Sequence, residues 1–167
     1  MSVVALAPYE FEPRDVREKP PRLGAPRQNG DDPLLPIFAN ERLRAVATPV
    51  THGTVPALAW RIEAGGKHIV FSGDTNGAGE NLTKLAQGAD LLIAHHAVLE
   101  GASGVERTLH MPPSVIARLA READVKQLVL SHRSLATLGL ETQTAEQIRQ
   151  RYPGPVSFAN DLDCLTP

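Results

Sequence analysis

Six residues capable of binding a metal ion or moving a proton stand where apolar stretches of this chain stop. Five close or directly follow a short hydrophobic run, and one precedes "MPP". Imidazole nitrogen and carboxylate oxygen together suit zinc, iron or manganese, and histidine also exchanges protons near neutral pH. The pattern therefore indicates metal-assisted or acid–base chemistry. The six are His52, Asp74, His95, His96, His110 and His132.

Taken singly, each of these residues also has a purely structural interpretation. Asp74 follows a glycine in "SGDT", which is ordinary turn chemistry. His95 and His96 are neighbours in an apolar run, so in a strand they point to opposite faces and at most one reaches a shared site. His110 could simply cap the helix that follows it. His68 lies early in its strand and receives no role.

The elements expected to position these residues alternate between strands and helices. "LRAVATPVTH" alternates and is partly β-branched, and "ALAWRIEAGGKHIVFSGDT" is typical of a β-hairpin. The expected strands cover residues 43–52, 57–63, 68–72, 90–99, 126–132 and 154–167. The expected helices cover 78–88, 111–125 and 144–152, with the last opened by Thr142 or Thr144, and 101–110 is expected to be a loop.

The helix expected over 111–125 supports a layered arrangement. Its Pro-Pro start suits a first helical turn. The order loop-β-β-β-α-β-α-β-α-β predicts an α/β fold, in which ligands collect at strand ends and helix N-termini. That is where the six residues lie. The apolar face of this helix consists of Val115, Ile116, Leu119, Ala120 and Ala123.

Residues 1–42 differ from the rest of the chain. Seven of its 14 prolines fall between Pro8 and Pro36. Proline at this density interrupts helices and strand ladders, so we expect mostly extended loop. Such a lead-in is typical of a linker, or of a loop that lies over a partner or substrate.

Composition limits the classes of function. The net charge of −2 and the pI of about 6.3 give no broad basic field of the kind that drives nonspecific nucleic-acid binding. Cys164 is the single cysteine, so no intrachain disulfide is expected, in keeping with a reducing, cytoplasmic location. No apolar run approaches the roughly 18 residues of a membrane-spanning helix, so no membrane partner is expected.

In combination and order, the motifs resemble the C-terminal half of a metallo-β-lactamase-fold hydrolase. "VTHGTVPALAWRI", "IVFSGDT", "LLIAHHA", "LHMPPSVIARLA" and "QLVLSH" follow one another within about residues 45–165. The branch they resemble is ribonuclease Z and the related phosphodiesterases. The resemblance implies an αβ/βα sandwich with two metal ions, usually zinc, with manganese or iron as alternatives.

The resemblance also implies a role for each motif residue. His52 resembles a ligand of the first metal, Asp74 the carboxylate that bridges both metals, and His132 the final ligand of the second. His110 takes the position of the catalytic histidine that protonates the leaving oxygen. Two metals about 3.5–4 Å apart can share a bridging hydroxide, which forms near neutral pH.

Two departures from the ribonuclease Z pattern bear on the substrate. The chain has His95-His96 where those enzymes have His-Glu, so His96 would have to orient His110, unless another residue does. Only 21 residues separate His52 from Asp74, which leaves no room for the long arm that grips transfer RNA. Both departures favour a small ester or phosphodiester substrate. No substrate-binding residue is identified.

The family signature His-x-His-x-Asp-His, which supplies two ligands to each metal, is absent from these 167 residues. We therefore expect residues 43–167 to form the C-terminal half of the domain, and residues 1–42 to connect it to a missing N-terminal half. The chain alone is then expected to be inactive. The missing half, or a complementing chain, would be its partner. Homo-oligomers are left open, although a second copy cannot restore the signature.

Alternative interpretations stay open at this point. The chain could be a non-catalytic, truncated remnant or a partner-binding module. A reduced site with one metal could also form from the four motif residues, with or without His96. After His132, Arg133 and Ser134 are expected to be solvated loop positions, with contact to an anionic substrate as the other reading. Asp161 is expected to end a strand near the site without a catalytic role.

Overall fold

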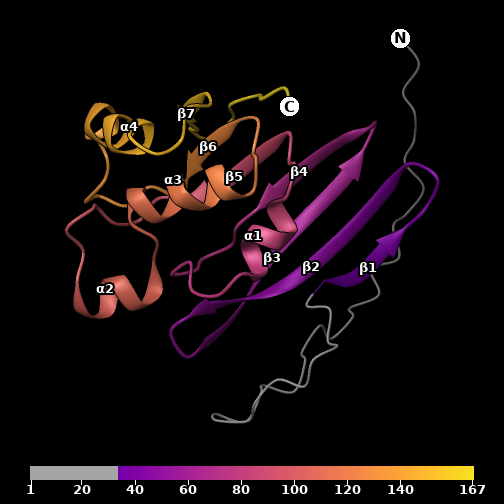
Figure 1. Cartoon of the computed structure of the whole chain (residues 1–167), viewed down its shortest axis with the longest axis horizontal. Coiled ribbons are helices and arrows are strands. Elements are labelled where there is room, and N and C mark those ends of the chain that lie inside the picture. Colours follow the sequence, from indigo (N-terminus) through magenta and orange to yellow (C-terminus); the bar gives the residue numbers. More distant parts are fainter. Residues whose placement is uncertain (1–33) are drawn as a thin grey trace. The chain divides into compact units, whose positions relative to one another are not determined.

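The strands of the computed structural model, which describes residues 34–167, form one sheet in the order of the sequence (Figure 1). Neighbours from β1 to β4 pair antiparallel, and neighbours from β4 to β7 pair parallel. Parallel neighbours require crossover connections, and these carry the helices. The strands are β1 (Leu35–Ala39), β2 (Leu43–His52), β3 (Val55–Ala64), β4 (Lys67–Phe71), β5 (Leu91–His95), β6 (Leu128–Ser131) and β7 (Val156–Phe158).

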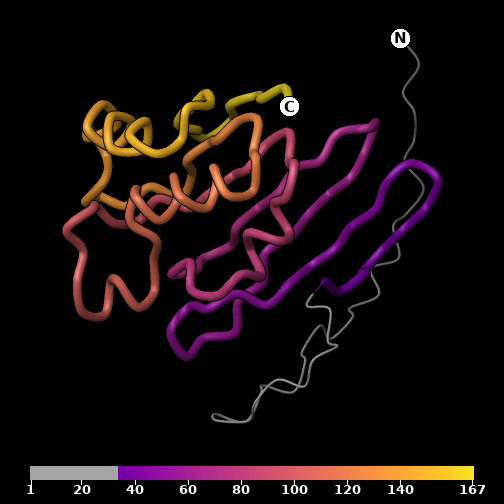
Figure 2. Tube along the Cα trace, viewed as in Figure 1, coloured from indigo at the N-terminus to yellow at the C-terminus, as the bar shows by residue number. Residues whose placement is uncertain are grey.

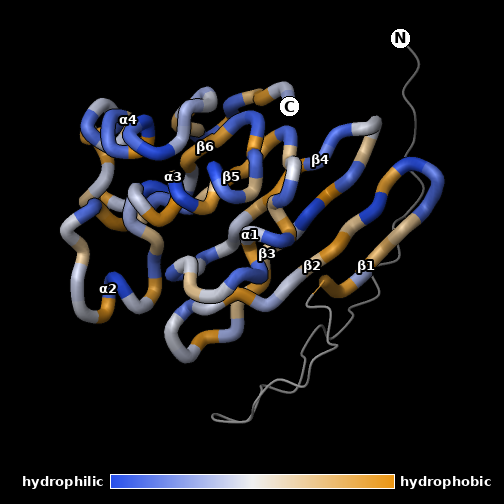
Figure 3. Tube along the Cα trace, in the orientation of Figure 1, coloured by the Kyte–Doolittle hydropathy of each residue, from blue (hydrophilic) through white to orange (hydrophobic). Residues whose placement is uncertain are grey.

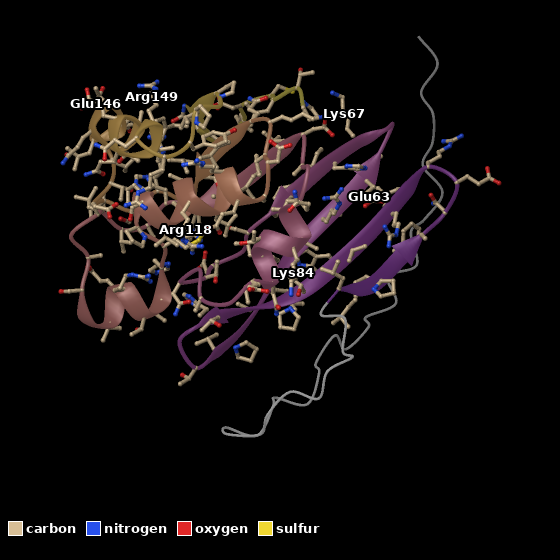
Figure 4. The ribbon with its side chains drawn as sticks, in the orientation of Figure 1. Glu63, Lys67, Lys84, Arg118, Glu146 and Arg149 are labelled. Carbon is tan, nitrogen blue, oxygen red and sulfur yellow. The ribbon has the colours of Figure 1, made fainter. Side chains whose placement is uncertain are left out.

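The helices in this part of the chain are α1 (Asn81–Ala86), α2 (Gly104–Leu109), α3 (Pro113–Glu122) and α4 (Glu141–Arg149). α1, α3 and α4 contribute buried residues to one core with the sheet, whereas α2 buries none and projects from the rest (Figure 1). Many segments of the strands are hydrophobic, whereas α4 is largely hydrophilic (Figure 3). Glu146 and Arg149 lie on the solvent side of α4 (Figure 4).

The alternation of each strand assigns its residues to one of the two faces of the sheet. Val46, Ala59, Val70 and Leu92 belong to the core under the helices. Their neighbours in sequence therefore point to the opposite face. None of the helices in the described residues is long and apolar enough to span a membrane.

The β2–β3 hairpin carries His52 to the end of the sheet. Its two ten-residue strands pair without interruption from Leu43↔Ala64 to His52↔Val55. The trace shows these strands as the longest arm of the fold (Figure 2). Continuous pairing fixes the register, so the position of His52 is set by the whole ladder.

The predicted α/β order is confirmed, but two predicted loops contain regular structure. β1 falls inside the lead-in of residues 1–42, where mostly extended loop was expected; residues 1–33 lie outside the described part. Pro36 is tolerated because β1 is an edge strand. α2 occupies the loop expected over 101–110. A helix without any buried residue has no apolar periodicity, so the sequence pattern could not reveal it.

Several predicted boundaries also differ. α4 begins at Glu141 rather than at Thr142 or Thr144, and its N-cap residue, Leu140, makes no side-chain cap. Without a capping side chain, the start has no local sequence signal. β7 covers only three residues of the strand expected over 154–167, and the exposed Asp161 lies beyond it.

Candidate active site

Asp74 lies in the loop that leaves β4, and the start of this loop is tightly fixed. The amide of Ser72 donates a hydrogen bond of 3.0 Å to the carbonyl of Ile93 in β5. Gly73 has φ +58°, and a Cβ atom there would lie 2.3 Å from the carbonyl oxygen of Leu58 in β3. Only glycine fits both the backbone angle and the close approach. Contacts with β5 and β3, the two neighbours of β4, thus fix the backbone directly before Asp74.

The far side of the same loop is held by the end of β2 and by the α2 segment. The Asn76 amide donates to the carbonyl of Thr51 at 2.8 Å. The Asn76 side-chain amide donates to the carbonyl of Thr108 at 2.9 Å, and Arg107 donates to the carbonyl of Asn76 at 3.0 Å. Asp74 therefore lies between two anchored points.

His132 and Asp74 meet from separate strand ends. The Nε2 atom of His132 lies 3.6 Å from Oδ2 of Asp74, and the side chains are 62% and 38% exposed, so both are accessible to an ion. Two ligand atoms of one tetrahedral zinc ion, bonded at about 2.0–2.2 Å, lie about 3.3–3.6 Å apart. The pair therefore fits two ligands of one metal ion.

One ring nitrogen of His52 is available to bind a metal ion. Its Nδ1 atom lies 2.9 Å from the carbonyl oxygen of Leu109. A carbonyl only accepts, so Nδ1 carries a proton, and in the neutral ring the lone pair is then on Nε2. Metal-binding histidines commonly have this arrangement, with the second nitrogen donating to a backbone carbonyl.

His110 lies between two other imidazoles. Its ring centroid is 5.2 Å from that of His52 and 5.1 Å from that of His95. The Nδ1 atom of His110 is buried and has no hydrogen-bond partner among the described residues. Burial lowers the pKa of His110, and the nearby carboxylate of Asp74 opposes that shift.

His95, the last residue of β5, and His96, which follows it, point in different directions. His95 contacts His110, whereas the ring of His96 lies 6.2 Å from that of Phe158 and its Nε2 atom lies 3.4 Å from Oγ1 of Thr144. The structure thus places His95, not His96, beside His110. Burial lowers the pKa of each of these two histidines to about 4. The local sequence does not indicate which of the two faces the site.

Arg133 and Ser134 lie in a loop, as expected, but their side chains contact the protein instead of extending freely into solvent. The Arg133 side chain is only 11% exposed and forms an ion pair with Glu141 at the start of α4. The Ser134 hydroxyl donates to the carbonyl of Ala97 at 2.7 Å. Through these two contacts, both residues stabilise the loop that follows β6. Their partners lie in other segments, 8 residues away for Glu141 and 37 for Ala97, so no local pattern predicted these contacts.

The potential metal-binding side chains in the described residues do not form a complete metal-binding group. Within residues 34–167, no group of three or more histidine, cysteine, aspartate or glutamate side chains is placed so that it could hold a metal ion. Asp74 and His132 form one pair of donors, and His52 belongs to the neighbouring histidine cluster. The assignment of these residues as ligands, and of His110 and His96 as catalytic, stays a prediction.

Comparison with known proteins assigns the family. The model of the Beta-lactamase superfamily domain matches residues 9–133, and the chain belongs to this superfamily. Ribonuclease Z from Myxococcus xanthus is 38% identical over 99 residues, which cover 58% of this chain and 31% of that protein. Ribonuclease Z from Nocardia farcinica is 32% identical over 152 residues, which cover 90% of this chain and 47% of that protein.

A solved structure supports the fold. The metallo-β-lactamase fold protein YhfI from Bacillus subtilis superposes with a TM-score of 0.66 at 23% identity, over 78% of this chain and 52% of that one. This superposition confirms the fold class, and the family model together with the two relatives confirms the ribonuclease Z-like resemblance. The chain spans about a third to a half of the length of these two ribonuclease Z relatives.

Proposed function

We propose that this chain supplies one half of a metal-dependent hydrolase that cleaves phosphodiester or other ester bonds. The observation that carries the proposal is the 3.6 Å approach of His132 Nε2 to Asp74 Oδ2 at two strand ends. His110 and His52 lie in contact at the same edge of the sheet. The ribonuclease Z relatives favour a phosphodiester among the ester substrates.

The residues present fit a metal centre in the chemistry of their donor atoms. Asp74 and His132 would bind through the facing oxygen and nitrogen, and His52 through the Nε2 atom left free by its bond to Leu109. Nitrogen and carboxylate donors favour zinc, with manganese or iron as alternatives. Two bound ions would polarise the scissile bond and lower the pKa of water.

His110 would act as the general acid that protonates the leaving oxygen. The ordinary pKa of histidine lies close to neutral pH, and although burial lowers the pKa of His110, the carboxylate of Asp74 favours its protonated form. The ring is held between those of His52 and His95, and its Nδ1 atom has no partner in the described part of the chain. Because Nδ1 is buried, the proton would pass to the substrate from the other ring nitrogen, Nε2.

The remaining ligands would come from a second sheet layer that carries His-x-His-x-Asp-His. This layer could belong to the same polypeptide or to a complementing chain. Supporting this, the face of the sheet opposite the helices is apolar, and register places Trp60, Phe71 and Ile93 side by side on it. Phe71 is 41% exposed. A continuous apolar face of this kind usually binds a partner surface.

The test uses the full-length gene product purified from its native source. We expect an intact mass above 18.0 kDa, bound zinc after dialysis, and hydrolysis of bis(p-nitrophenyl) phosphate. Asp74→Ala in that product should abolish zinc binding and reduce hydrolysis by about 10³-fold or more. His68→Gln, in the strand that leads to Asp74, is the matched control and should preserve both. Full hydrolysis by the Asp74→Ala protein would overturn the proposal.

A second candidate function is a non-catalytic partner-binding module. The observation in its favour is the absence of the metal-binding signature from the sequence, together with the apolar sheet face. A native mass of 18.0 kDa, no zinc after dialysis and no hydrolysis would support this candidate.

A further inference from the structure

We infer that His95 is a positioning residue, whose single neutral imidazole ties the Asp74 loop to the segment that carries His110. The inference rests on the proposed function, because it assigns His95 to the same site. It concerns the residue that holds the predicted metal ligand and the predicted general acid at a fixed separation.

Both ring nitrogens of His95 have backbone partners of opposite type. Nδ1 lies 2.9 Å from the carbonyl oxygen of Gly73, which can only accept. The amide of Met111 donates to Nε2 over 3.3 Å. One nitrogen must therefore carry the proton and the other must lack it. The two contacts define the Nδ1–H tautomer. A second proton, on Nε2, would break the hydrogen bond from the Met111 amide.

The two partners of the imidazole are the immediate neighbours of the predicted site residues. Gly73 precedes Asp74, and Met111 follows His110. The ring of His95 is 3% exposed and also contacts the ring of His110. Burial lowers the pKa of His95 to about 4, which agrees with a neutral ring at neutral pH. One side chain thus joins two segments that are distant in the sequence.

The strand that carries His95 reaches a third site residue through its backbone. His95 pairs with Ser131 in the parallel β5–β6 register, and Ser131 precedes His132. The His95 amide donates to Oγ of Ser72 at 3.2 Å, and the Ser72 hydroxyl donates to the Gly73 carbonyl at 2.7 Å. A rigid link matters here, because misplacing a catalytic group by about 1 Å can cost 10²-fold in rate.

The first test needs neither metal nor activity. Two-bond ¹H–¹⁵N spectra of the chain at pH 7, assigned by comparison with a His95 variant, report the tautomer of this ring. We expect a protonated-type Nδ1 and an unprotonated-type Nε2. An Nε2–H tautomer, an average of both, or a protonated ring would overturn the inference.

The second test separates the two contacts with a pair of variants. In His95→Asn the side-chain amide can replace Nδ1 as donor to Gly73, but nothing reaches Met111. In His95→Gln the longer side chain can place its carbonyl oxygen near the position of Nε2 and accept from Met111, while the donor to Gly73 is lost. His68→Gln serves as the control that removes an imidazole from the neighbouring strand.

We expect hydrogen exchange of the Met111 amide to accelerate at least tenfold in His95→Asn and to stay near wild type in His95→Gln. In the full-length product, His95→Gln should weaken zinc binding by about 10–100-fold, while His95→Asn lowers kcat with zinc content retained. Wild-type Met111 exchange in both variants would overturn the inference. If Met111 exchange responds as expected but no protein binds zinc, the positioning link stands and the proposed function fails.

Discussion

Arg133 and Glu141 form an ion pair that joins the residue after His132 to the first residue of α4. The guanidinium of Arg133 also donates to Oδ1 of Asn160 at 2.5 Å. His132 itself has φ +50°, in the left-handed region that a side chain disfavours. A backbone in that region persists only where its surroundings hold it. The ion pair therefore helps to fix a predicted metal ligand.

Replacing Arg133 tests this link. Arg133→Met removes the guanidinium that donates to Asn160 and pairs with Glu141, which keeps only weaker support from the Gly139 amide at 3.2 Å. We expect the melting temperature to fall by about 4 °C or more. The matched control is Arg118→Met, because Arg118 and Glu122 form a surface pair whose side chains are 43% and 47% exposed. That change should shift the melting temperature by about 1 °C or less. Equal shifts measured by differential scanning calorimetry would contradict the role of Arg133.

Acid should destabilise the fold between about pH 6.5 and pH 4. Burial lowers the folded-state pKa of His95 and His96 to about 4, from 6.5. Across this window the unfolded chain takes up protons that the folded chain does not, so stability is complete above pH 6.5 and is lost as the pH falls toward 4. Each of these two histidines should lower the free energy of unfolding by on the order of 2–3 kcal/mol as the pH falls through this window. Urea unfolding at pH 7, 6 and 5 measures the loss.

A variant at His96 isolates its share of this dependence. His96→Leu should reduce the slope of the unfolding free energy against pH by about one proton. Asp90 does not interfere, because its hydrogen bond from Lys126 holds its pKa at about 2, and its contribution is lost only as the pH falls from 3.8 toward 2. An unchanged slope in His96→Leu would show that His96 does not titrate in this window.

Substitutions at Gly73 and Gly66 distinguish the cost of a steric clash from the cost of a positive φ angle. Both have positive φ, but a Cβ at Gly73 would lie 2.3 Å from the Leu58 carbonyl oxygen, whereas a Cβ at Gly66 meets nothing within 4 Å. Gly66→Ala should cost about 1–2 kcal/mol, and Gly73→Ala about 3 kcal/mol or more. Gly73→Ala should also weaken zinc binding, because Asp74 follows directly. Equal losses in chemical unfolding would exclude the predicted clash.

The sequence allowed the fold and the edge of the sheet that carries the site to be predicted, because strand ends and apolar runs are local features. His52, Asp74 and His132 could each be placed at a strand end from the residues before them. The choice between His95 and His96 could not be made, because it depends on which face of β5 the helices cover. The partners of Arg133 were equally hidden, since Glu141 lies eight residues away at the start of another element and Asn160 lies 27 residues away.

The apolar sheet face should mediate association of the chain when no partner layer covers it. Phe71 lies at the centre of this face, between Trp60 and Ile93 in the register, and a charge there would lose hydration on association. Phe71→Lys should weaken self-association in sedimentation experiments by about tenfold or more. Val105→Lys is the control, because Val105 is 72% exposed on α2 and buries nothing. If both variants sediment as the wild type does, this face is not the contact.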